Sequence, residues 1–280
     1  MKTDLIYEQQ GNNVVIFNVF PFDLEQTLDC GQSFRWCRVS DNTWQGVAHG
    51  RIMKIAYNEG SLTLFNTNTD EFNKIWRGYF DLDRDYAQII ETIKSDRVLT
   101  KAVEYAGGIR VLRQDPWETL CSFIISQNNN IKRIKGIIQR LCMHFGEQIG
   151  EGFYTFPAPE HLAKLTAGDL SPIKCGFRAK YILDAAQKVA EGRVDIYNLH
   201  KLPITKARER LMAIYGVGPK VADCTLLFGC GFIEAFPQDV WIKRAMKVLF
   251  DGSLPDVAKP YAGIVQQYIF HYARITKLEI

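Results

Sequence analysis

The sequence contains no long hydrophobic run. No segment approaches the roughly 18–20 consecutive apolar residues that a membrane-spanning helix needs. A signal-peptide pattern is also missing, because the first residues lead into polar sequence, so we expect an intracellular protein without a membrane partner. The chain is not of the disordered class, since 47% of its 280 residues are hydrophobic and 23% are charged.

The seven cysteines lack the spacings of metal and redox sites. No two of them form a C-x-x-C pair, which excludes zinc-ribbon and thioredoxin patterns. No cluster of four cysteines follows Cys230, so we expect no iron–sulfur cluster. Free or buried thiols in a reducing cytoplasm are the expected state of these residues.

The charge is divided unevenly along the chain. Residues 1–100 hold 10 basic and 14 acidic residues, for a net charge of −4, whereas residues 101–280 have a net charge of +7. A basic C-terminal part suggests an anionic partner, and nucleic acid is the first candidate. Solvated basic helix faces can give the same pattern, so the charge alone does not decide.

Hydrophobic periodicity predicts an α+β protein with two parts. Apolar alternation and turn signals predict strands at 13–19, 33–39, 51–57 and 61–65, with a further strand from Trp44 and a helix near 70–79. Residues 1–82 are therefore expected to form an N-terminal antiparallel α/β domain. The period then changes to 3.6, and residues 83–280 are expected to be helical. The predicted helices are 85–93, 116–125, 131–141, 159–165, 177–190, 205–214, 219–228, 240–250 and 259–274.

A Gly-Val-Gly-Pro turn at 216–219 lies between two of these helices. Gly216 and Gly218 allow positive φ and close approach of a ligand, and Pro219 suits the first position of a helix. Free N–H groups at such a turn can bind a DNA phosphate. The segment at about 205–228 therefore reads as a helix-hairpin-helix motif, against the alternative of a tight turn without a ligand.

Lys220 and Asp239 are the candidate catalytic pair. Lys220 follows the turn directly and could be a phosphate contact or an amine nucleophile. Asp239 precedes a helix and could be an ordinary N-cap. Together, an amine and a carboxylate suit chemistry at the anomeric carbon of a sugar: the carboxylate stabilises positive charge, and the amine forms a Schiff base.

These segments resemble the helix-hairpin-helix DNA glycosylase superfamily. Further segments are similar to 8-oxoguanine DNA glycosylases, namely Gly-Gln-Ser-Phe-Arg-Trp at 31–36, Leu-Arg-Gln-Asp-Pro at 112–116, Ser-Gln-Asn-Asn-Asn-Ile at 126–131, and 261–270. The resemblance extends from about residue 20 to 275. It implies a compact bacterial enzyme, monomeric and cytoplasmic, that excises 8-oxoguanine from duplex DNA and nicks the strand by β-elimination. No cofactor is implied.

The resemblance also implies roles for single residues. Lys220 would be the nucleophile and Asp239 the catalytic aspartate. The base pocket would consist of Gly31, Cys224, Phe228, Gln266 and Phe270. In it, the Gly31 carbonyl would accept the N7 hydrogen that only the oxidised base has, and Gln266 would read the Watson–Crick edge. The base would lie between Cys224 and Phe270.

Other positions are implied in DNA binding. Residues that would contact the opposite cytosine or the DNA backbone are Asn128, Arg133, Phe177, Arg178, Gly216, Gly218 and Trp241. For Arg133 and Arg178, a simple phosphate contact is the alternative. The backbone carbonyls of Met212, Ile214 and Val217 would hold a structural cation, which is not catalytic. Phe177, Trp241 and Phe228 differ from the tyrosine, histidine and methionine of better-known relatives.

Three other functions remain as alternatives. The first is another glycosylase of the superfamily. A cluster-bearing enzyme for pyrimidine lesions would need four clustered cysteines, which the sequence lacks, and a monofunctional enzyme for alkylated bases would not need Lys220. A non-catalytic DNA-binding module would use the hairpin only to bind phosphates. A structural helical protein would have its basic face by chance. Neither of the last two requires both Lys220 and Asp239.

Overall fold

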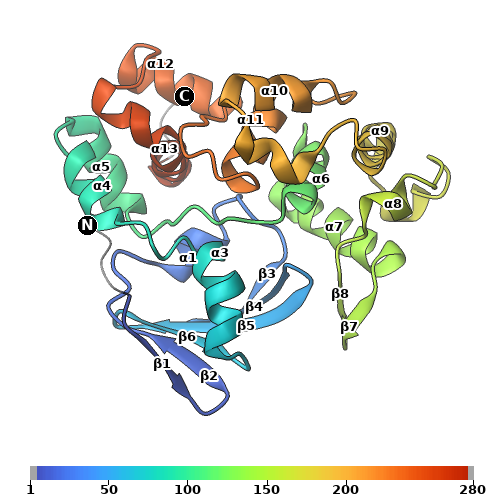
Figure 1. The fold of residues 1–280 in the computed structure, drawn as a ribbon. Coiled ribbons are helices and arrows are strands. Elements are labelled where there is room, and N and C mark those ends of the chain that lie inside the picture. Colours follow the sequence, from blue (N-terminus) through green and yellow to red (C-terminus); the bar gives the residue numbers. More distant parts are fainter. Residues whose placement is uncertain (1–4, 277–280) are drawn as a thin grey trace.

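The computed structural model describes residues 5–276, and its N-terminal part is one antiparallel sheet at the bottom of Figure 1. The strand order is β1-β2-β6-β5-β4-β3. The strands are β1 (Tyr7–Gln10), β2 (Asn13–Ile16), β3 (Trp36–Ser40), β4 (Thr43–Ala48), β5 (Arg51–Asn58) and β6 (Ser61–Phe65). The pairing of β2 with β6, which are far apart in sequence, places Ile16 opposite Leu62.

Local sequence explains the central hairpin of the sheet. β5 and β6 are joined by Glu59 and Gly60, which both have positive φ, at 46° and 84°. A two-residue turn of this kind matches the twist of the strands it connects. Alternating side chains such as Met53, Ile55 and Leu64 are fully buried on one face of the sheet. The sheet therefore covers a core on one side, as the alternation predicts.

The rest of the chain is mostly helical. Short helices α1 (Leu24–Leu28), α2 (Thr69–Glu71) and α3 (Arg77–Tyr79) accompany the sheet. The larger helical part contains α4 (Tyr86–Ile93), α5 (Arg97–Ala106), α6 (Pro116–Ser126), α7 (Ile131–Phe145), α8 (Pro159–Leu162), α9 (Ala179–Ala190), α10 (Ile204–Met212), α11 (Pro219–Phe228), α12 (Val240–Phe250) and α13 (Ala262–Thr276). A small hairpin of β7 (Gln148–Gly150) and β8 (Phe153–Tyr154) follows α7. The α+β fold class is confirmed.

The predicted bounds of α11 and α12 are confirmed, and several others were wrong. The first predicted strand ends at Ile16, before Asn18 takes a left-handed backbone. The helix predicted from 259 begins only at Ala262, because a 3₁₀ helix containing Pro260 precedes it. The helix predicted at 159–165 ends at Leu162. The hydrophobic pattern did not predict β1, α1, α5 or the hairpin of β7 and β8.

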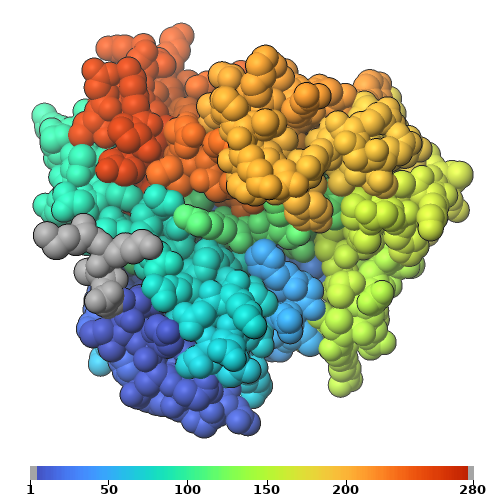
Figure 2. Space-filling model, viewed as in Figure 1, coloured from blue at the N-terminus to red at the C-terminus, as the bar shows by residue number. Residues whose placement is uncertain are grey.

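Within residues 5–276 there are two hydrophobic cores, one against the sheet and one among the helices. The sheet core includes Leu112, and the helical core includes Cys30 and Phe34 from the N-terminal part. Each core therefore contains side chains from both sides of the domain boundary that we expect at residue 82. In the space-filling view, the blue sheet and the orange and red helices meet across green and teal segments (Figure 2).

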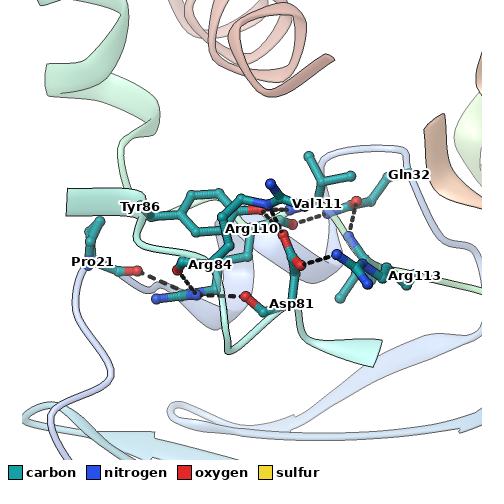
Figure 3. A network of polar contacts seen from close by, with 9 residues as sticks. Pro21, Gln32, Asp81, Arg84, Tyr86, Arg110, Val111 and Arg113 are labelled. Atoms are coloured by element: carbon teal, nitrogen blue, oxygen red, sulfur yellow. Dashed lines mark hydrogen bonds and ion pairs between the residues drawn. The ribbon is translucent and has the colours of Figure 1, made fainter. Parts of the chain in front are cut away.

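A buried polar network joins these parts (Figure 3). Arg110, which is 3% exposed, donates hydrogen bonds to the carbonyls of Pro21 and Asp81, at 3.2 and 3.0 Å. The Asp81 carboxylate accepts a hydrogen bond from the Tyr86 hydroxyl and pairs with Arg113 at 2.9 Å. Burial lowers the pKa of Arg110, yet the surrounding acceptors satisfy its charge. The network fixes the connection between α3 and α6 beneath the helices.

Among residues 5–276, no helix combines the length and the apolar character needed to cross a bilayer.

Candidate active site

The predicted hairpin is formed by α10, a tight turn and α11. Gly216 has φ of +80°, and a Cβ atom there would lie 2.4 Å from the Tyr181 ring. Only glycine fits this combination of backbone and space. Gly218 precedes Pro219 at the first turn of α11, and no side chain caps that helix. The first N–H groups of α11 are therefore free to bind an anion.

Helix α9 holds the turn from behind. Asp184 accepts a hydrogen bond from the Tyr215 N–H at 2.6 Å, and Lys188 donates one to the Ala213 carbonyl at 2.8 Å. Lys188 and Asp184 also form an ion pair at 2.8 Å. The turn is thus fixed by side chains of a neighbouring helix rather than by its own sequence alone.

Lys220 lies in the first turn of α11 and is half-buried. Its Nζ donates a hydrogen bond to the Ser126 Oγ at 3.1 Å and lies 4.9 Å from the centroid of the Phe123 ring. The Ser126 hydroxyl donates in turn to the Phe123 carbonyl at 2.8 Å. Among residues 5–276, no carboxylate lies within 4.0 Å of Nζ. The amine is therefore held by a neutral hydroxyl and an aromatic face.

Asp239 is the N-cap of α12. Its Oδ1 accepts a hydrogen bond from the Ile242 N–H at 2.8 Å. The capping role that the sequence left open is therefore present. It does not exclude a second role, because the carboxylate also lines the same pocket as Lys220.

This pocket, of about 390 Å³ with its open mouth, brings distant parts of the chain together. Its walls come from the loop after α1, from α6 and α11, from the segment before α12, and from α13. The lining residues are Cys30, Gly31, Phe123, Lys220, Cys224, Phe228, Pro237, Asp239, Gln266, Gln267 and Phe270. The two candidate catalytic residues and the five candidate base-pocket residues are all among them.

Apart from Lys220 and Asp239, the lining residues of the pocket are uncharged, and three of them are phenylalanines. Phe123 stacks on Phe228 with ring centroids 5.4 Å apart and planes at 18°. Burial raises the pKa of the Cys224 thiol to about 11, against the opposing effect of Lys220, so this thiol stays protonated at neutral pH. Gly31 has φ of +90°, a backbone conformation that favours glycine. An apolar slot with few polar groups is typical of sites for a planar ligand.

Sequence reasoning missed four lining residues: Cys30, Phe123, Pro237 and Gln267. It also missed Ser126, which holds Lys220 from outside the lining set. One signal could have found Gln267, because two consecutive amides interrupt an otherwise apolar run on α13. Cys30 and Ser126 have no such local signal, since their partners Gln267 and Lys220 lie 237 and 94 positions away in the sequence.

The residues predicted to contact DNA differ in exposure. Asn128, Arg133, Phe177 and Trp241 are exposed, whereas Arg178 is only 2% exposed. The Arg178 guanidinium donates to the carbonyls of Gln127, Asn128 and Cys175 and lies 4.4 Å from the Phe177 ring. Asn128 has φ of +47°, so Arg178 fixes a left-handed loop residue. Burial lowers the pKa of Arg178.

The predicted cation ligands lie in the hairpin turn. The Ile214 carbonyl accepts a hydrogen bond from the Val217 N–H at 3.1 Å and keeps one lone pair. In the described part of the chain, no group of three or more acidic, histidine or cysteine side chains could hold a metal. The carbonyl site of Met212, Ile214 and Val217 stays a prediction.

Two family models match consecutive parts of the chain. Residues 14–120 match the 8-oxoguanine DNA glycosylase N-terminal domain, and residues 121–254 match the HhH-GPD superfamily of base excision DNA repair proteins. A curated relative is the N-glycosylase/DNA lyase of Saccharomyces cerevisiae, 34% identical over 80% of this chain and 67% of its own length.

Two solved structures are similar over nearly the whole chain. MBOgg1, in complex with a low affinity DNA ligand, shares 41% identity and a TM-score of 0.93, covering 98% of this chain and all of its own. The Clostridium acetobutylicum 8-oxoguanine glycosylase/lyase, in complex with double-stranded DNA containing cytosine opposite 8-oxoG, shares 36% identity and a TM-score of 0.92, covering 99% and 100%.

The fold and the hairpin thus define an HhH-GPD base excision DNA repair protein. Within this class, the chain belongs to the 8-oxoguanine DNA glycosylase family and is a bifunctional DNA N-glycosylase and DNA lyase. The family resemblance predicted from the sequence is confirmed.

Proposed function

We propose that the protein excises 8-oxoguanine from duplex DNA, preferably opposite cytosine, and then cleaves the strand by β-elimination. The observation that carries the proposal is the shared pocket, where Lys220 and Asp239 lie beside a slot walled by Phe228 and Phe270. A planar base that flips out of the duplex fits such a slot. The relative from Clostridium acetobutylicum, crystallised with this lesion opposite cytosine, supports the choice of substrate.

Recognition of the oxidised base would depend on Gly31 and Gln266. The Gly31 carbonyl would accept the N7 hydrogen of 8-oxoguanine, whereas the N7 acceptor of guanine would face a second acceptor. Gln266 would bind the Watson–Crick edge of the flipped base. Cys224, as a neutral thiol, and Phe270 would pack on its two faces.

The chemistry would proceed at C1′ of the sugar. The bond from C1′ to N9 breaks, and Asp239 stabilises the positive charge that develops on the sugar. The Nζ of Lys220 then bonds to C1′, loses a proton, and a Schiff base forms as the ring oxygen leaves C1′. Loss of a C2′ proton finally expels the 3′ phosphate by breaking the C3′–O bond.

The exposed residues predicted to contact DNA would bind the duplex around the flipped base. Phe177 would fill the space that the flipped base leaves, and Asn128 and Arg133 would bind the orphaned cytosine. Arg178 would act on this site by holding the Asn128 backbone, in addition to any direct contact. The hairpin N–H groups at Gly216 and Gly218 would bind a phosphate, with Trp241 beside it. The cation at the carbonyls of Met212, Ile214 and Val217 would bridge the turn and the phosphate.

Borohydride trapping tests the proposal directly. The substrates are a duplex with one 8-oxoguanine opposite cytosine, the same duplex with adenine opposite, and an undamaged duplex. We expect a covalent adduct with the first duplex, a weaker one with the second and none with the third. Lys220→Gln should abolish the adduct, and Asp239→Asn should slow base release by about 100-fold or more. Base release without an adduct would contradict the Schiff-base mechanism.

A further inference from the structure

Two consecutive glutamines on α13 share the wall of the pocket. Gln266 and Gln267 are only 6% and 4% exposed, and both line the cavity. Neighbouring positions on a helix point about 100° apart, so their side chains meet only if both bend toward each other. They do meet, because the Gln267 Nε2 donates a hydrogen bond to the Gln266 Oε1 at 2.6 Å. One amide therefore fixes the direction of the other.

Cys30, in the loop after α1, contacts this pair within the same pocket. Its Sγ lies 3.3 Å from the Gln267 Oε1 and 3.5 Å from the Thr27 carbonyl, and both neighbours are acceptors. Burial raises the pKa of the thiol to about 12, so it keeps its hydrogen and acts as a donor. A donor facing the Gln267 Oε1 directs the Nε2 of that amide toward Gln266. The hydrogen bonds thus form a chain in which Cys30 donates to Gln267 and Gln267 donates to Gln266.

The direction of the Gln266 amide matters for a purine. Guanine presents an acceptor at O6 beside a donor at N1, whereas adenine presents a donor at N6 beside an acceptor at N1. An amide pairs with either edge, but only after it turns by 180°. An amide held by Gln267 cannot turn without losing a buried hydrogen bond, which is costly in a low-dielectric site.

We propose that Gln267 is a positioning residue that fixes the Gln266 amide and thereby selects a guanine-type edge over an adenine-type edge. The inference rests on the proposed function, because it concerns the base that this pocket receives. Gln267 acts through Gln266 and needs no contact of its own with the base. Cys30 supports the same arrangement from the neighbouring turn.

The test compares Gln267→Leu with the wild-type chain on three duplexes under single-turnover conditions. One duplex contains 8-oxoguanine, one contains 8-oxoadenine, and one contains a preformed abasic site, each opposite cytosine. The two oxidised bases share the N7 hydrogen and differ at the Watson–Crick edge. We expect Gln267→Leu to slow 8-oxoguanine excision about tenfold and to lower the preference for it over 8-oxoadenine about fivefold or more. Nicking of the abasic site should stay within about twofold of wild type.

Matched variants separate positioning from folding. Gln187→Leu makes the same change at an exposed site on α9 and should leave all three rates unchanged. Cys30→Ser keeps a donor beside Gln267 and should retain the preference that Cys30→Ala weakens. The proposal is overturned if Gln267→Leu slows all three substrates equally, or leaves the preference intact. A wild-type chain that nicks abasic DNA but leaves 8-oxoguanine in place would instead contradict the proposed function.

Discussion

At the scale of single residues, Ser126 and Phe123 hold the amine of Lys220 in place. The Ser126 hydroxyl accepts one N–H of Lys220 while it donates to the Phe123 carbonyl, so its lone pair faces the amine. The Phe123 ring lies beneath the same Nζ. These contacts position the nitrogen without a carboxylate within ion-pair distance in the described part of the chain. The proposed nucleophile is therefore held at the pocket by groups that remain neutral.

This geometry predicts the effect of Ser126→Ala. Loss of one net hydrogen bond costs about 1 kcal/mol, so we expect the rate of borohydride trapping on lesion DNA to fall roughly fivefold. Trapping on a preformed abasic duplex should fall by the same factor, since the amine acts in both reactions. Ser122→Ala, one turn earlier on α6 and outside the pocket, is the control. An unchanged trapping rate in Ser126→Ala would show that the hydroxyl does not position the amine.

At the scale of an element, the hairpin depends on two glycines for different reasons. Gly216 has a positive φ and lies against the Tyr181 ring, so it serves the packing of the turn on α9. Gly218 has φ of −95°, and a Cβ atom there would meet nothing within 4 Å. At the open N-terminus of α11, Gly218 would leave room for the phosphate that we propose binds there.

Alanine substitutions should separate these two roles. Gly216→Ala forces a methyl group into the Tyr181 ring and strains the backbone, so we expect a loss of about 2–4 kcal/mol in the free energy of unfolding. Gly218→Ala should change that free energy by less than about 1 kcal/mol and weaken DNA binding. Thermal unfolding and binding to duplex DNA at fixed salt would measure both effects. Equal destabilisation by the two substitutions would contradict the assignment.

At the scale of the whole molecule, charged side chains join the sheet to the helices. Arg35, just before β3, pairs with Glu118 on α6 at 3.1 Å, and their side chains are 10% and 14% exposed. Arg35 also donates to the Tyr154 carbonyl in β8. Burial raises the pKa of Glu118, although Arg35 opposes this effect. Desolvation of this carboxylate therefore outweighs its ion pair, as is common for buried pairs.

The raised pKa sets the sign of a pH-dependent prediction. The pKa of Glu118 is higher in the folded state than in the unfolded state, so between these two values the folded state binds more protons. The stability of the folded state therefore falls as the pH rises through this range and Glu118 ionises. Glu118→Gln lacks this ionisation. We therefore expect the variant to gain stability relative to wild type as the pH is raised through the pKa of Glu118, and to match it most closely in acid. Denaturant unfolding at several pH values would test this, and a difference that does not change with pH would contradict it.

Much of this protein could be predicted from local sequence. Gly-x-Gly turns, N-cap residues and hydrophobic periods act over a few residues, so the hairpin and the helices α11 and α12 followed from the sequence. The resemblance named Lys220, Asp239 and the five candidate base-pocket residues before their contacts were known. Short or weakly patterned elements such as β1, α1 and α5 were missed, because tertiary packing stabilises them more than propensity does.

By itself, the sequence determined which residues are candidates for the chemistry, because residue type and local backbone are properties of neighbours in the chain. Only the tertiary structure decided how those residues are oriented. Lys220 forms a hydrogen bond with Ser126, which is 94 positions away in the sequence, and Cys30 forms one with Gln267, which is 237 positions away. The tertiary structure also buries Arg178, whose guanidinium donates a hydrogen bond to the Asn128 carbonyl. Such contacts depend on how whole helices pack, and no local pattern encodes the direction of a buried amide or amine.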